Sequence, residues 1–266
     1  MPADLLELYK TSAVNQISGF CHVAERLDVE DLAKAYRGLD KSAPSRHERK
    51  PSLDYFVGHS GEAPGGESSN RREELLAMAL WNSARKSPPL ALPGGEQLDL
   101  LDYQFPLKAQ RSDKGVGKVD LLGLINEETF CVIELKIHRE GKGKSDTPLR
   151  AFLETLAYCA IVEANITAIA KEARAKFGHV VAGKKPALMV MAPEAYWVDY
   201  VNHPKAGNWW PVLKHLADQV EKSLEVECYF VALRNADFTM GSSSEKPAIT
   251  GKCSLTFVED LVHESH

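Results

Sequence analysis

Three charged residues inside otherwise apolar, strand-like segments constrain this chain more than any other feature. Asp120 lies near the start of an apolar run over residues 119–125, and Glu134 and Lys136 lie inside another over residues 130–137. The second run is rich in β-branched and aromatic residues, which favour strands. An unpaired charge buried there would cost several kcal/mol, so we expect the two acids to share a cation that offsets their desolvation.

The geometry of a strand places these charges together. Side chains alternate between the two faces of a strand, so Glu134 and Lys136 point to one face and Leu135 to the other. A tight turn over residues 126–129 would pair the two runs as a hairpin and bring Asp120 to the same end as Glu134. The pattern therefore predicts two carboxylates and one ammonium group around a common point.

Two carboxylates beside a lysine are suited to metal-dependent phosphodiester hydrolysis. Hard carboxylate oxygens favour Mg²⁺ or Mn²⁺, which keep several water ligands, and a neighbouring lysine can orient or help to deprotonate one water. The structural alternative is ordinary: Asp120 could solvate the start of a strand, while Glu134 and Lys136 form an exposed ion pair on an edge strand.

An aspartate followed after a hairpin by Glu134-Leu135-Lys136 resembles the PD-(D/E)XK nuclease superfamily, which has the restriction-endonuclease-like fold. Lys118 and Val119, rather than a proline, precede the aspartate here. The resemblance implies metal ligation by Asp120, Glu134 and the carbonyl of Leu135, with the attacking water placed by Lys136.

The predicted order of elements agrees with the αβββαβ core that the resemblance requires, an α/β fold with a mixed central sheet flanked by helices. A helix capped at Ser69 or Asn70 is expected to reach residue 85. Strands follow over residues 98–109, 118–125 and 130–137. A helix opening at Ser145-Asp146-Thr147-Pro148 is expected to run to residue 177, before a parallel strand over residues 187–192. A helix over residues 204–224 and a strand over residues 225–233 extend the core.

Two helices carry candidate accessory residues. In the resembled superfamily a glutamate on the first core helix often completes the metal shell, and we favour Glu73 over Glu74 because it shares a face with the inward apolar residues. The alternative is that acids in a first turn simply favour the helix dipole. On the second helix Glu154 and Tyr158 are similar to the Q-x-x-x-Y motif of RecB-like and lambda-exonuclease-like nucleases, with glutamate in place of glutamine. Tyr158 as a half-buried core residue is the competing interpretation.

Charge is distributed unevenly. The whole chain of 266 residues carries a net charge of −5, which argues against nonspecific polyanion binding by the protein as a whole. Residues 106–118 and 136–150 are each net positive and flank the proposed acids, so we expect phosphate contacts there. The candidate nucleic-acid-binding residues are Lys118, His138, Arg139, Lys142, Lys144 and Arg150. The lysines could equally keep a mobile loop soluble, and His138 could be an ordinary surface histidine.

The sequence predicts three regions: an N-terminal helical and irregular extension (residues 1–69), the nuclease-like domain (70–240) and a C-terminal tail with a possible extra strand (241–266). Helices are expected over residues 4–19 and 29–38, and packing of residues 53–57. The five cysteines show no zinc spacing. No signal peptide or long apolar segment is evident, so a cytoplasmic protein that does not enter membranes is expected.

The function expected from these features is a Mg²⁺- or Mn²⁺-dependent nuclease acting on nucleic acid, with DNA as the favoured partner and a homodimer as one arrangement. The alternative is a non-catalytic module that keeps the fold to bind nucleic acid or another protein.

Overall fold

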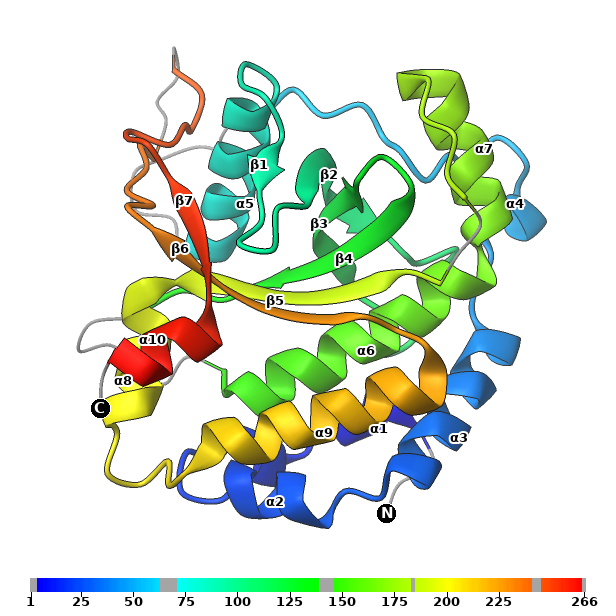
Figure 1. The fold of residues 1–266 in the computed structure, drawn as a ribbon. Helices are drawn as coiled ribbons and strands as arrows, with labels where there is room; N and C mark the ends of the chain where they lie inside the picture. The colour runs from blue at the N-terminus through cyan, green and yellow to red at the C-terminus, as the bar shows by residue number, and fades with distance from the viewer. Residues whose placement is uncertain (1–3, 63–70, 139–145, 183–184, 241–244, 265–266) are drawn as a thin grey trace.

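The chain forms a mixed α/β fold around one seven-stranded sheet (Figure 1). The computed structural model describes residues 4–62, 71–138, 146–182, 185–240 and 245–264. Strands follow one another across the sheet in chain order. They are β1 (Leu90–Ala91), β2 (Gln97–Pro106), β3 (Lys118–Ile125), β4 (Thr129–Leu135), β5 (Ala187–Pro193), β6 (Cys228–Arg234) and β7 (Ser254–Phe257).

The sheet is antiparallel from β1 to β4, parallel from β4 to β6, and antiparallel again between β6 and β7. The parallel pairing of β4 with β5 confirms the prediction from the helical crossover between them. Both strands are almost wholly apolar because helices cover both faces of a parallel pair.

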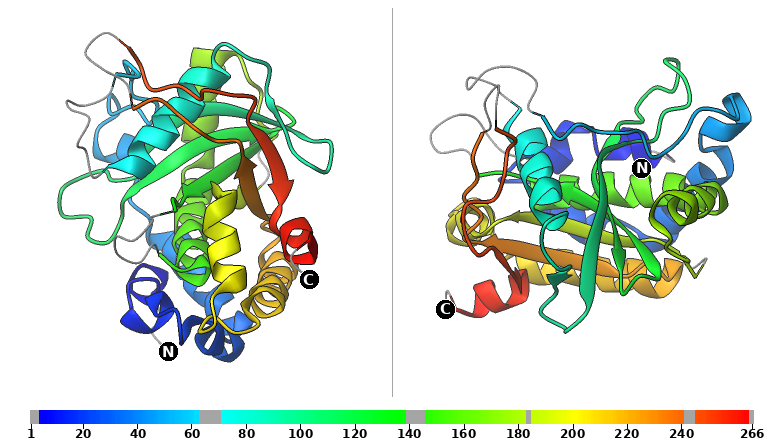
Figure 2. Two further views of the ribbon diagram at one scale, coloured as in Figure 1. Left: turned by 90° about the vertical axis from the view of Figure 1, so that its left-hand side faces the viewer. Right: turned by 90° about the horizontal axis from the view of Figure 1, so that it is seen from above.

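Helices lie on both faces of the sheet (Figures 1 and 2). Helix α5 packs against β2 and β3 on one face, and α6 and α9 cover the other, with the N-terminal helices outside them. The helices are α1 (Leu5–Leu8), α2 (Phe20–Arg26), α3 (Val29–Ser42), α4 (Arg46–Arg49), α5 (Arg72–Ala84), α6 (Pro148–Ala164), α7 (Ile166–Phe177), α8 (Glu194–Asn202), α9 (Trp209–Leu224) and α10 (Val258–Glu264), with a 3₁₀ turn at Ser12–Asn15.

The hairpin of β3 and β4 forms as predicted. Asn126 and Glu127 at its turn have φ angles of 51° and 59°, the left-handed pair that suits the twist of a hairpin. The pairing runs from Ile125 opposite Thr129 to Leu121 opposite Ile133 and stops there. Asp120 therefore lies beyond the last paired position, where the strands begin to separate.

The predicted helix over residues 148–177 is wrong in one respect. Thr147 caps its start by accepting the backbone N–H of Arg150, as expected, but the helix breaks at Asn165 and continues as α7 after a 79° bend. The Asn165 side chain donates to the carbonyls of Ile161 and Pro44 and accepts from the Tyr55 hydroxyl. These bonds stabilise the break, because a side chain that binds local carbonyls competes with the helical backbone.

Other predicted helix boundaries also differ from those in the structure. The last long helix begins at Trp209 and not near residue 204, because residues 204–206 form a turn and Gly207 is left-handed with φ 65°. The predicted helix over residues 4–19 is broken at Thr11, which is extended with ψ 140°. The α5 cap is Arg71; Ser69 and Asn70 fall outside the described residues. Helices α8 and α10 were not predicted, whereas the extra C-terminal strand is present as β7.

The N-terminal residues share an apolar core with α6 and α9. Tyr55 and Phe56 are buried there, as expected for residues 53–57, and Cys131 and Cys159 are buried small residues. No single helix of the described ranges has the length and apolar character needed to cross a membrane; α6 and α7 would meet such a test only as one bent pair.

Candidate active site

Asp120 is held by the strands on either side of it. Its Oδ2 accepts the backbone N–H of Leu135 at 2.9 Å, across the gap where β3 and β4 stop pairing. Its Oδ1 accepts from the Gln104 side chain of β2 at 3.1 Å. The carboxylate is thereby fixed beside the strand that carries the other two predicted residues.

Glu134 and Lys136 form a buried ion pair on the α6 side of β4. The Lys136 Nζ lies 2.7 Å from the Glu134 Oε1, and the two residues are 2% and 6% exposed. Two further acids approach the same ammonium group: Asp146 at 3.6 Å and Glu154 on α6 at 4.0 Å. This geometry differs from the exposed edge pair that was the alternative interpretation of the sequence.

The pKa values in this cluster reflect crowding of negative charge. Burial raises the pKa of Asp120 to about 6, although Lys136 and the Leu135 N–H act against it. Burial, and then the charge of Asp120, raise the pKa of Glu134 well above its usual range. Burial alone would lower the pKa of Lys136, but Glu134, Glu154 and their neighbours raise it well above normal. At neutral pH the lysine is therefore a cation and a hydrogen-bond donor.

Helix α6 brings its predicted accessory residues to the same place. Tyr158 donates a hydrogen bond to Glu154 at 3.0 Å, and burial raises the pKa of the tyrosine far above its normal value. The backbone at Gly117 passes so close to the Tyr158 hydroxyl that a β-carbon there would overlap it. Tyr158 is thus both a buried core residue and the partner of an acid that faces Lys136.

The two candidate glutamates of α5 are distinguished by their neighbours. Glu73 lies near enough to Asp120 and Lys136 to raise the pKa of both. Glu74 instead pairs with Arg71 at 3.6 Å and raises the pKa of Tyr103. The arrangement agrees with the preference for Glu73 that the helical face suggested.

The predicted nucleic-acid-binding residues do not form one free cationic surface within the described ranges. Lys118 is exposed at the start of β3. His138 pairs with Asp199 of α8 at 2.8 Å, and Arg150 pairs with Asp146 at 2.7 Å. Arg139, Lys142 and Lys144 lie outside the described residues.

The donor set suits a hard divalent cation. Acidic groups outnumber basic ones in this buried region, and the excess negative charge is of the kind that a bound cation neutralises. The acids are Glu73, Asp120, Glu134, Asp146 and Glu154; the bases are Lys136 and Arg150.

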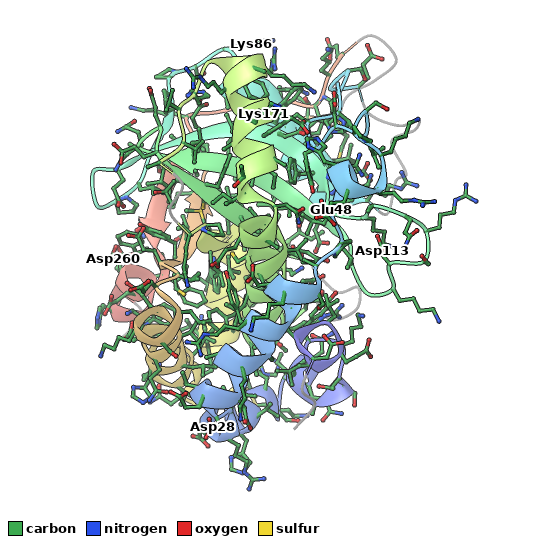
Figure 3. The ribbon with its side chains drawn as sticks, turned by 90° about the vertical axis from the view of Figure 1, so that its right-hand side faces the viewer. Asp28, Glu48, Lys86, Asp113, Lys171 and Asp260 are labelled. Atoms are coloured by element: carbon green, nitrogen blue, oxygen red, sulfur yellow. The ribbon has the colours of Figure 1, made fainter. Side chains whose placement is uncertain are left out.

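A different group of residues also brings potential metal-ligand atoms close together. Among the described residues, the three potential ligand atoms that all lie within 4.8 Å of one another come from His47, Asp54 and Glu172. Figure 3 faces this side of the molecule, with Glu48 of α4 and Lys171 of α7 labelled. Glu172 already accepts the backbone N–H groups of Tyr55 and Phe56 and binds His47, so its geometry is explained by anchoring the N-terminal segment. No sequence pattern signals this group, because its members are far apart in the chain.

Comparison of the chain with protein-family models, with curated proteins and with solved structures finds no match in any of the three.

Proposed function

We propose that this protein is a divalent-metal-dependent nuclease that hydrolyses phosphodiester bonds, with DNA as its substrate. The observation that carries the proposal is the convergence of Asp120 and Glu134, one from each strand of a splayed hairpin, beside the ammonium group of Lys136. Two strand-borne carboxylates with a lysine two residues after the second are what the resemblance to PD-(D/E)XK nucleases implies.

The order of elements supports the same assignment. Helix α5, the antiparallel strands β2, β3 and β4, helix α6 and the parallel strand β5 follow in the sequence of a restriction-endonuclease-like core. We propose that these elements are that core. The remaining parts, β6, β7 and the N-terminal helices, extend it.

Asp120 and Glu134 would hold Mg²⁺ or Mn²⁺, with the Leu135 carbonyl and Glu73 as further donors. Such an ion supplies Lewis acidity and stabilises charge that develops on the phosphate oxygens. Lys136 remains protonated, so it donates a hydrogen bond that orients the attacking water or a phosphate oxygen. Glu154 is held by Tyr158 and lies beside the lysine, where it limits the directions in which Nζ can point.

The first experiment separates metal binding from cleavage. Mn²⁺ binding is measured by calorimetry for the wild type and for Asp120→Asn, which keeps an acceptor oxygen for Leu135. We expect the substitution to weaken binding at least about tenfold, as loss of one anionic ligand does. Equal Mn²⁺ affinity in the two proteins would contradict the proposed metal centre.

The second experiment incubates the protein with linear double-stranded, circular and single-stranded DNA and with RNA, with Mg²⁺ or EDTA. Cleavage is expected with Mg²⁺ only and is lost in Lys136→Met. Lys222→Met, at an exposed lysine of α9, is the matched control. Mn²⁺ binding without cleavage of any substrate would replace the enzyme by a binding module that keeps the fold.

A further inference from the structure

A cavity, which we call the Asp102 pocket, lies beside β2. It has a volume of about 970 Å³, within the range of small-molecule sites. The ends of α5 and α7 and the segments 56–60 and 245–248 surround it. None of its lining residues belongs to the proposed metal centre. Figure 3 shows Lys86, one of its rim residues, at the same end of the molecule as Lys171 of α7.

The inner wall of the pocket contains a buried acid with unused hydrogen-bonding capacity. Asp102 is 3% exposed. Its Oδ1 accepts the backbone N–H of Tyr103 at 2.9 Å, whereas its Oδ2 has no hydrogen-bond partner among the described residues. Burial raises the pKa of this carboxyl to about 7. A buried acceptor without a donor is costly, and a ligand that supplies the donor recovers that cost.

The side chain of His59, close to this acid, also contains an unsatisfied polar atom. The His59 Nε2 lies 3.2 Å from the Asp102 Oδ1 but makes no hydrogen bond to any described residue. The imidazole ring packs on Tyr103 with 4.2 Å between ring centroids. A flat ligand with adjacent N–H donors on one edge would satisfy both Asp102 and His59.

The outer part of the pocket has exposed apolar surface. Val57 and Phe177 both line it and are both 39% exposed. Within the described part of the chain, the exposed large apolar side chains are those of Val57, Phe177 and Val180. The Phe177 ring meets Phe56 edge-on at 5.2 Å, so its orientation is fixed. A positioned, exposed aromatic face is what a heterocyclic base stacks on.

The rim is cationic. Lys86, Lys246 and Arg85 line the pocket, with one acid at the rim, Glu245; Lys176 also lines it but pairs with Asp54 at 3.2 Å. Arg85 is held over the Trp81 ring at 4.7 Å, and Lys246 donates to the Ser60 carbonyl. Fixed lysine and arginine groups at the mouth of an apolar pocket favour a ligand whose outer end is an anion such as phosphate.

We infer that the Asp102 pocket binds a nucleoside phosphate, with the base stacked on Phe177, a donor edge such as that of guanine on Asp102, and the phosphate at the lysine rim. Carboxylates recognise bases through exocyclic amino groups and ring N–H donors. The ligand is either a free mononucleotide or the terminal nucleotide of a nucleic acid. This binding does not require the proposed cleavage site.

Calorimetric titration of the full chain with GMP, IMP, UMP and guanosine tests the base and the phosphate. GMP is expected to bind about tenfold or more tightly than UMP, because only guanine offers two adjacent N–H donors, one for Asp102 and one for His59. IMP, which lacks the exocyclic amino group, should lie between them, and guanosine should bind more weakly than GMP. Single-stranded oligonucleotides with a 5′-terminal guanosine, with and without a 5′-phosphate, show whether the ligand is a free nucleotide or a chain end.

Four variants locate the site. Asp102→Asn is expected to abolish the preference for GMP over UMP, and Phe177→Ala to weaken both nucleotides alike. Asp31→Asn, an exposed acid of α3, and Asp120→Asn should both leave GMP binding unchanged. Far-ultraviolet circular dichroism confirms that each variant is folded. The inference fails if folded Asp102→Asn keeps the full preference, if Asp120→Asn removes GMP binding, or if the wild type binds none of these compounds.

Discussion

Asp120 and Leu135 are joined by a hydrogen bond of 2.9 Å between a side-chain oxygen and a backbone N–H, at the point where β3 and β4 stop pairing. The aspartate side chain takes the place of the next backbone hydrogen bond between β3 and β4. Its carboxylate is consequently positioned by the backbone of the strand that carries Glu134, so the two acids keep their relative placement even though they come from different strands.

Glu73 and Glu74 provide a matched pair on one helix. Glu73→Gln should weaken Mn²⁺ binding by about three- to tenfold, because Glu73 contributes negative charge near Asp120. Glu74→Gln should leave it unchanged, because Glu74 pairs with Arg71. Calorimetry with Mn²⁺ measures both. Equal losses in the two variants would mean that overall helix charge matters and not the position of Glu73.

Removal of Lys136 should destabilise the fold. Lys136→Met leaves Glu134 without its partner in a buried site, which typically costs about 3–5 kcal/mol in the free energy of unfolding. The double variant Glu134→Gln/Lys136→Met should lose less, since the buried Glu134 carboxylate is removed together with its partner. Urea denaturation measures these values. The control Lys214→Met breaks a surface pair with Asp218 and should change stability by less than about 1 kcal/mol.

Gly117 controls the position of Tyr158. Gly117→Ala should lower the free energy of unfolding by about 1–3 kcal/mol, because its β-carbon would overlap the Tyr158 hydroxyl. In a Tyr158→Phe background the same change should cost less, since the atom that it overlaps is gone. Gly38→Ala in α3, where nothing lies within 4 Å of the added carbon, should instead be neutral or stabilising. Equal costs in both backgrounds would rule out this contact as the cause.

Asn165 connects the α6–α7 bend to the N-terminal segment. Asn165→Ala should destabilise the protein by about 2–4 kcal/mol, since it removes three hydrogen bonds and leaves the Tyr55 O–H without this acceptor and the Pro44 carbonyl without this donor. Limited proteolysis should then cut sooner within residues 43–57. Exposed Asn202→Ala on α8 should do neither. Unchanged proteolysis in a destabilised Asn165→Ala protein would show that the segment is held by other contacts.

Asp102 should make stability depend on pH. Its pKa is about 7 in the folded protein against 3.8 in its usual state, so the folded state retains a proton that the unfolded state has lost. The free energy of unfolding should therefore fall as pH rises from about 4 to about 7, by up to about 4 kcal/mol at 1.36 kcal/mol per pKa unit. Asp102→Asn should lose this contribution and exceed the wild type in stability above pH 7. Urea unfolding at pH 4, 6 and 8 measures the difference. A difference that does not vary with pH would contradict the raised pKa.

The parts of the fold that could be predicted are those determined by local pattern. Apolar runs bounded by polar turns give β3, β4 and β5, and the Thr147-Pro148 start signal gives α6. The bend at Asn165 could not be found in this way, because apolar spacing continues across it and its cause is contact with residues 44 and 55. Helix α8 begins at Glu194, directly after β5, and Pro193 before it offers no side-chain cap that would separate the helix from the strand.

The candidate sites, too, could be predicted only where a local sequence pattern marks their residues. Asp120, Glu134 and Lys136 are recognisable because each interrupts an apolar run, whereas the approach of Asp146 to Lys136 depends on tertiary packing. Asp102 carries no such signal, because its strand β2 also contains Gln97, Asp99 and Gln104. Its pocket could not be assembled from the sequence, because the lining comes from distant segments.

The anchoring of residues 44–56 on α7 and Asn165 also determines what can be removed from this protein. Tyr55, Phe56 and the first helices contribute to the apolar core that covers α6, the helix that carries Glu154 and Tyr158. A fragment that starts at residue 71 would expose the covered face of α6 to water and lose the register of α6 against β4. Domain dissection for biochemistry or crystallisation must therefore retain the N-terminal quarter of the molecule as an integral part of the folded unit.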